Sequence, residues 1–78
     1  MNTEQIIRLA RHKLATAPEN EGSARVCLAD AIACYDKGDL HHARERALRS
    51  LSYSVGVLDR DYQRAAASHV ASMGKDSE

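Results

Sequence analysis

Large aromatic side chains are almost absent from this sequence, which contains no tryptophan, no phenylalanine and three tyrosines among its 78 residues. Leucine, isoleucine and valine together supply only 14 further large apolar side chains, and much of the remaining apolar content is alanine. A domain of this size buries only about 60% of the surface that its unfolded chain exposes. We therefore expect one folded domain with a thin core, of the kind that is often completed by self-association or by a partner.

Net charge, long apolar runs and closely placed cysteines are also missing. Eleven basic residues balance eleven acidic ones, so the excess positive charge of most nucleic-acid binders is absent. No run approaches the ~20 apolar residues of a membrane span, and charges interrupt the first 14 residues, so we expect neither a membrane helix nor a signal peptide. Cys27 and Cys34 lie about 10 Å apart along a predicted helix, too far for a disulfide. We therefore expect free, buried thiols in a cytoplasmic protein, and the composition rich in alanine and arginine suggests a bacterial or phage origin.

Apolar residues recur every three to four positions along most of the chain, which predicts an all-α fold. We expect a small bundle of three to four helices with a central helix–turn–helix hairpin. The expected helices span about 3–16, 23–37, 40–56 and 59–72, and residues 73–78 are expected to fray. The last two helices are either separate or one bent helix, because Gly56 weakens the pattern between them. Asp59 or Asp61 is then the expected start of the last helix.

Capping and helix-breaking residues support these boundaries. Thr3 and Ser23 are the expected N-caps of the first two helices, and Pro18 is expected to end the first helix before a short linker. Gly38 is expected to end the second helix in a left-handed conformation, with Asp39 as the N-cap of the third. The positions expected to face the core include Ile6, Ile7, Ala10, Leu14, Ala17, Ala24, Cys27, Leu28, Ala31, Ala43, Ala47, Leu48 and Leu51.

The hairpin segment, over residues 24–55, resembles the helix–turn–helix unit of a tetratricopeptide repeat. Tyr35 stands where that family has an aromatic residue near the end of its first helix. Gly38-Asp39-Leu40 matches the turn, and Ala31 and Ala43 supply small residues where the two helices touch. The resemblance implies a pair of antiparallel helices used to recognise a protein or a peptide.

The sequence departs from the repeat family in several places. The family's tryptophan and leucine positions fall on Cys27 and Asp30, and the proline that follows the second helix is absent. Neither flanking helix repeats the pattern, so the resemblance covers one hairpin and not an array of three or more repeats. Recognition by the exposed side of the first helix would involve Arg25, Tyr35 and Asp36.

Residues suited to catalysis or metal binding show no familiar spacing. His41 and His42 are adjacent, so their side chains point about 100° apart on a helix and cannot easily share one ion. Ser50, Ser52 and Ser54 lack the flanking motif of a nucleophile, and no glycine-rich phosphate loop is present. We expect no enzymatic activity, no cofactor and no metal site.

The segment from Leu48 to Tyr62 is the most apolar part of the chain. Its apolar residues point in more directions than one core face requires, and a helix of this kind is usually covered on several sides. Tyrosine is also enriched at protein interfaces. The candidate protein-binding residues are therefore Leu51, Tyr53, Val57, Leu58 and Tyr62, in addition to Arg25, Tyr35 and Asp36. We expect a homodimer and a protein partner of unknown identity, which together describe a small non-enzymatic adaptor or regulator.

A nucleic-acid-binding regulator is the alternative interpretation. Arg44, Arg46 and Arg49 follow the short hairpin turn and could line the recognition helix of a DNA-binding helix–turn–helix. Glu45 interrupts this basic segment, and pairs such as Glu45–Arg49 are also common on a solvated helix face. Nucleic acid is therefore the less favoured partner.

Overall fold

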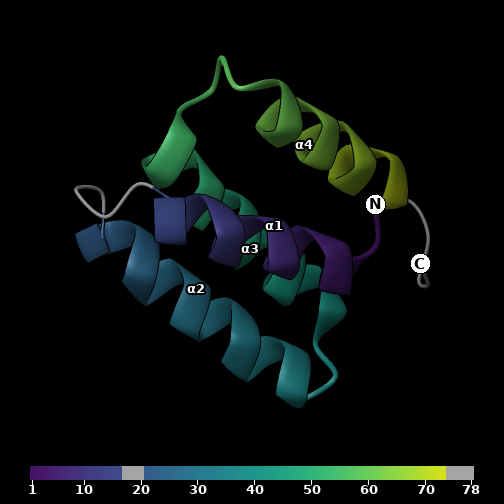
Figure 1. Cartoon of the computed structure of the whole chain (residues 1–78). Coiled ribbons are helices and arrows are strands. Elements are labelled where there is room, and N and C mark those ends of the chain that lie inside the picture. Colours follow the sequence, from purple (N-terminus) through teal and green to yellow (C-terminus); the bar gives the residue numbers. More distant parts are fainter. Residues whose placement is uncertain (17–20, 74–78) are drawn as a thin grey trace.

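The computed structural model describes residues 1–16 and 21–73 and contains four α-helices and no strand in that part of the chain. The helices are α1 (Thr3–Thr16), α2 (Glu21–Asp36), α3 (Leu40–Val55) and α4 (Arg60–Ser72). Successive helices alternate in direction, and α2 and α4 flank the α1–α3 pair on opposite sides (Figure 1). The predicted all-α bundle is confirmed. Ala17, Pro18 and the expected tail from residue 74 onward lie outside the described residues.

The N-termini of the first two helices differ from the predicted ones. The side-chain oxygen of Asn2 accepts a hydrogen bond from the backbone N–H of Gln5 at 2.9 Å, and the Gln5 side-chain oxygen accepts one from the Asn2 N–H at 2.9 Å. This reciprocal pair is a capping box. Thr3, the predicted cap, is instead the buried first residue of α1. Ser23 is not a cap either, because α2 already begins at Glu21, within the predicted linker.

The turn between α2 and α3 confirms the prediction for Gly38 and Asp39. Gly38 has a φ of 81°. Its N–H donates to the carbonyl of Tyr35 at 3.0 Å, and the Asp39 N–H donates to the carbonyl of Cys34 at 2.9 Å. These two bonds form a Schellman motif, which satisfies carbonyls that the helix end would leave without partners. The Asp39 carboxylate then accepts from the His42 N–H and caps α3.

The last two helices are separate. Gly56 has a φ of 79° and follows the last residue of α3. Asp59 caps α4, because its side chain accepts a hydrogen bond from the Tyr62 N–H. The alternative of one bent helix is therefore wrong, and Asp59, not Asp61, is the cap.

The core is centred on α3, which packs against each of the other three helices. Its members are Ile6, Ile7, Ala10, Leu28, Ala31, Ala43, Ala47, Leu48, Leu51 and Ala65. The Ser50 hydroxyl is fully buried and donates a hydrogen bond to the carbonyl of Ala24 at 2.7 Å, which joins α3 to α2.

Cys27 is buried, Cys34 is half-buried, and both thiols are free. Within the described residues, no helix is both long and apolar enough to cross a membrane.

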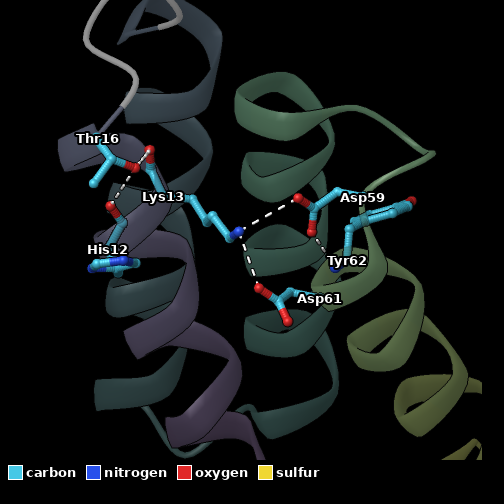
Figure 2. Close-up of polar contacts among 6 residues, drawn as sticks. All are labelled: His12, Lys13, Thr16, Asp59, Asp61 and Tyr62. Carbon is cyan, nitrogen blue, oxygen red and sulfur yellow. Dashed lines mark hydrogen bonds and ion pairs between the residues drawn. The ribbon is translucent and has the colours of Figure 1, made fainter.

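Polar contacts attach α4 to α1. Lys13 on α1 reaches the carboxylates of Asp59 and Asp61, with N–O distances of 3.4 and 3.0 Å (Figure 2). The hydrogen bond with Asp61 is the main reason why the pKa of Lys13 is raised, and Asp59 adds to it. The Tyr62 N–H, and then Lys13, lower the pKa of Asp59. At the opposite end of α4, the Ser68 hydroxyl accepts from the amino group of Met1 at 2.7 Å and donates to the Met1 carbonyl at 2.6 Å.

Candidate functional site

The predicted protein-binding residues do not form one surface. Leu51 has no exposed surface, so its predicted binding role is wrong, because a fully buried side chain cannot reach a partner. Tyr62 is half-buried and packs against the core. Val57 and Leu58 are exposed in the turn between α3 and α4.

Tyr35 and Asp36 lie in a groove between α1 and α2, which we call the α1/α2 groove. It is lined by Glu4, Ile7, Arg8, Arg11, Ile32, Tyr35 and Asp36. An ion pair of 2.8 Å joins Arg8 to Glu4, so two charges of this groove already neutralise each other. Arg25 is exposed on the same helix as Tyr35 and Asp36.

A second, more open groove lies between α2 and α3, and we call it the α2/α3 groove. Its lining is Gly22, Ser23, Val26, Cys27, Asp30, Arg46, Arg49 and Tyr53. Val26 is 62% exposed and Tyr53 is 51% exposed. The groove therefore presents two large apolar side chains to solvent beside two arginines and one aspartate. Sequence reasoning identified Tyr53 but missed Val26, although Val26 is a large aliphatic residue on the side of α2 that faces away from the core.

The three arginines of the nucleic-acid alternative do not share one exposed face. Arg44 is buried, so its predicted contact with phosphate is wrong. Arg46 is half-buried, Arg49 is exposed, and both line the α2/α3 groove. This groove also contains Asp30, whose negative charge opposes the binding of a phosphate backbone.

Three side chains that were not predicted to form a site meet between α3 and α4. His41 and Glu45 lie one turn apart on α3, with 3.6 Å between His41 Nε2 and Glu45 Oε2. The His69 ring of α4 lies 5.2 Å from the His41 ring, measured between centroids. One potential ligand atom from each of these residues lies within 4.8 Å of the other two. We call these residues the His41–Glu45–His69 cluster.

His69 is the buried member of this cluster. It is only 5% exposed, and neither of its ring nitrogens has a hydrogen-bond partner among the described residues. Burial, and then the nearby His41 and Arg44, lower the pKa of His69, which favours the neutral ring.

His42 belongs to a different arrangement from its neighbour His41. Its Nδ1 lies 2.8 Å from the Asp39 carboxylate, and this contact lowers the pKa of Asp39. Adjacency therefore argues against an ion shared by His41 and His42, but it does not exclude one shared by His41 and residues other than His42. The combination of His41 with Glu45 was visible as an i, i+4 spacing, but His69 is 28 positions from His41 and only the fold brings it near.

Comparison with known proteins assigns no family, because no protein-family model, no curated protein and no solved structure matches this chain. The interpretation of the molecule therefore depends on its own residues. The two grooves and the His41–Glu45–His69 cluster are the features with the clearest chemistry.

Proposed function

We propose that this chain is a small, non-enzymatic adaptor or regulator of the cytoplasm, which binds another protein and acts as a homodimer. The observation that carries the proposal is the pair of exposed apolar side chains, Val26 and Tyr53, in the α2/α3 groove. Exposed apolar groups in a groove with polar surroundings are typical of protein-binding sites. Tyrosine and arginine are also the residues that contribute most often to binding energy at such sites.

A second copy of the chain is the proposed occupant of the α2/α3 groove. The groove carries Asp30 together with Arg46 and Arg49, and a two-fold interface places each surface against its own copy. Asp30 of one copy then lies opposite the arginines of the other, so the charges are self-complementary. Val26 and Tyr53 supply the apolar centre.

The partner protein is proposed to bind the α1/α2 groove. This assignment follows the resemblance of α2 and α3 to a tetratricopeptide hairpin, in which the first helix recognises a protein or a peptide. The buried Ala31 and Ala43 support that resemblance, since both lie in the core as small residues of the facing helices. Tyr35 and Asp36 would then contact the partner, with Arg25 exposed on the same helix.

Sedimentation at micromolar concentration tests the dimer. Wild type is expected to sediment as a dimer and Tyr53→Asp as a folded monomer, because two like charges near the axis are costly in an apolar contact. Tyr35→Asp introduces the same change in the α1/α2 groove and is the matched control, expected to remain dimeric. A wild type that stays monomeric at a hundred micromolar would refute the homodimer.

A pull-down from lysate tests the partner surface. Wild type should capture the partner protein, and Tyr35→Asp should not, because the substitution changes the α1/α2 groove.

A gel shift separates the adaptor proposal from the alternative of nucleic-acid binding. We expect no gel shift of random duplex at micromolar protein and physiological salt, where non-specific binders have dissociation constants of about 10⁻⁴–10⁻⁶ M. A shift that falls with salt by a log–log slope of about −0.9 per phosphate contact, and that disappears in Arg46→Ala/Arg49→Ala, would replace the adaptor proposal. A double substitution at Arg8 and Arg11 on α1 controls for the loss of two positive charges.

A further inference from the structure

We propose that His41, Glu45 and His69 form a binding site for a divalent transition-metal ion of the Zn²⁺ type, which joins α4 to α3. The proposal is independent of the protein-binding function, because the cluster shares no residue with either groove. It depends on three observations: the separation of the ligand atoms, the burial of His69 and the weak packing of α4.

The cluster needs little change to reach the geometry of a zinc site. Zinc binds histidine nitrogen and carboxylate oxygen at about 2.0–2.2 Å in a tetrahedral arrangement, which places ligand atoms roughly 3.3–3.5 Å apart. The His41–Glu45 separation of 3.6 Å is already close to this value. The third ligand, His69, lies within 4.8 Å of both. His41 is exposed and Glu45 is partly exposed, so small rotations of their side chains can close the remaining distance.

His69 supplies an independent reason to expect a ligand. Almost all buried polar side-chain atoms in folded proteins have a hydrogen-bond partner, and a buried group without one costs free energy. Both ring nitrogens of His69 are buried without a partner among residues 1–16 and 21–73. A metal bond would satisfy one of them.

The ligand set selects the class of ion. Two imidazoles and one carboxylate suit Zn²⁺, and Ni²⁺ and Cu²⁺ also bind such nitrogen-rich sites, whereas Mg²⁺ and Ca²⁺ prefer oxygen ligands. Three protein ligands leave a fourth position for water on the exposed side of the cluster. Arg44 lies near His69 and disfavours an added positive charge, and the Glu45 carboxylate counters part of that effect.

The position of the cluster gives the ion a structural role. The buried side chains of α4 are Ala65 and His69, and Tyr62 and Ala66 are only partly buried against the core. This helix therefore has less apolar contact with the core than any other helix of the bundle. Two ligands from α3 and one from α4 would form a cross-link between the two helices. Because the ion binds the folded arrangement, it shifts the local equilibrium of α4 toward the docked state.

Titration of the metal-free chain with ZnCl₂, CoCl₂ and MgCl₂ tests the proposal. Calorimetry should give one Zn²⁺ per chain, and Co²⁺ should produce a tetrahedral absorption spectrum without the charge-transfer band of a thiolate ligand, which excludes Cys27 and Cys34. Mg²⁺ should not bind. Hydrogen exchange of the α4 amides should slow when Zn²⁺ is added, with a smaller change in α2.

Single substitutions show whether Zn²⁺ binds to the His41–Glu45–His69 cluster or to other histidines. His69→Ala and His41→Ala should each weaken Zn²⁺ binding by at least about 10- to 100-fold, the loss caused even by changing residues that only support a metal ligand. His42→Ala is the matched control and should bind like wild type, since His42 contacts Asp39 and lies outside the cluster. Glu45→Gln keeps the size of the side chain and should also weaken binding, which covers the case in which His69→Ala fails to fold. Wild type that binds no Zn²⁺, or binding lost in His42→Ala and retained in His41→Ala and Glu45→Gln, would overturn the proposal.

Discussion

The α2–α3 and α3–α4 hairpins share two turn features but differ in how their helices are packed. Each turn contains a glycine with positive φ and an aspartate that caps the next helix, directly after Gly38 in one case and three residues after Gly56 in the other. Between α2 and α3, small alanines and large leucines fill a continuous apolar core. On α4 the fully buried side chains are one alanine and one histidine, with Tyr62 and Ala66 partly buried against the core, and ion pairs and hydrogen bonds add polar contacts to α1 and Met1.

This difference shows that turn residues place a helix but do not determine how firmly it is held. Apolar burial contributes roughly 25 cal/mol per Å², whereas an exposed ion pair contributes little net stability. The α2–α3 hairpin, with α1, should therefore unfold as the global unit. Helix α4 should open at a lower free energy, as a local event.

Leu51→Ala is expected to have the largest effect, because Leu51 lies fully buried in the core. Truncation of a buried leucine typically costs about 2–5 kcal/mol, and urea unfolding should show that loss for the whole chain. Leu58→Ala is the control: Leu58 is 87% exposed, so its truncation should change stability by less than about 0.5 kcal/mol. A Leu51→Ala variant as stable as Leu58→Ala would place the core elsewhere.

Gly38→Val should cost about 1 kcal/mol or more, because a β-branched residue is strained at positive φ. A Cβ at Gly38 meets nothing within 4 Å, so the cost comes from the backbone alone. Gly22→Ala is the matched control, since a Cβ there is equally unobstructed and Gly22 lies inside α2. Gly22 is the second residue of α2, so alanine there should stabilise the chain by less than the roughly 1 kcal/mol of a helix interior. Equal thermal melts for wild type and Gly38→Val would show that the turn is misplaced.

Gly56→Val introduces the same backbone strain in the other hairpin, with a φ of 79° and open space around the added Cβ. Because α4 is held by few buried side chains, the strain can be relieved by undocking α4. We expect faster hydrogen exchange in α4 and a smaller loss of global stability than Gly38→Val causes. If Gly56→Val instead lowers the melting temperature as much as Gly38→Val, α4 belongs to the same cooperative unit as the other helices.

The Lys13 contacts with Asp59 and Asp61 should have the smallest effect, limited to α4. Lys13→Met is expected to speed hydrogen exchange in α4 with little change in the global melt, and Lys37→Met at the other hairpin is the charge control. The raised pKa of Lys13 makes its stabilisation complete below 10.5 and lost as pH rises further. The lowered pKa of Asp59 makes its contribution complete above 3.8 and lost as pH falls further. Thermal melts at different pH values measure both losses of stability, and Lys13→Met should remove the loss at alkaline pH.

Local patterns predicted much of the fold because their causes are local. The periodicity of apolar residues predicts the helical segments but leaves open whether the last two are separate. Gly38 and Asp39 predict the central turn, since positive φ and side-chain capping depend on a few neighbouring atoms. The predicted start of α2 is wrong because Ser23 has a side chain typical of N-caps, whereas the helix begins at Glu21. The predicted cap of α1 is wrong because Asn2 and Thr3 are adjacent and both favour the N-cap position, and the hydrogen bonds with Gln5 select Asn2.

The candidate sites were harder to predict, because exposure depends on every helix that packs nearby. Leu51 and Arg44 belong to segments that suggested binding surfaces, yet α3 is covered on three sides and buries both. The same packing leaves Val26 and Tyr53 exposed in one groove. Periodicity describes which residues share a face of one helix, but it does not give the number of faces that other helices cover.

By itself, the sequence determined that the chain is helical, where the central hairpin turn lies and that long apolar segments are absent, because these properties follow from neighbouring residues along the chain. Only the tertiary structure decided which side chains are accessible and which distant residues meet. His41 and Glu45 are neighbours by helical spacing, but His69 joins them because α4 folds back along α3. The physical reason is that packing one helix against another brings together residues whose separation along the chain carries no information about their distance in space.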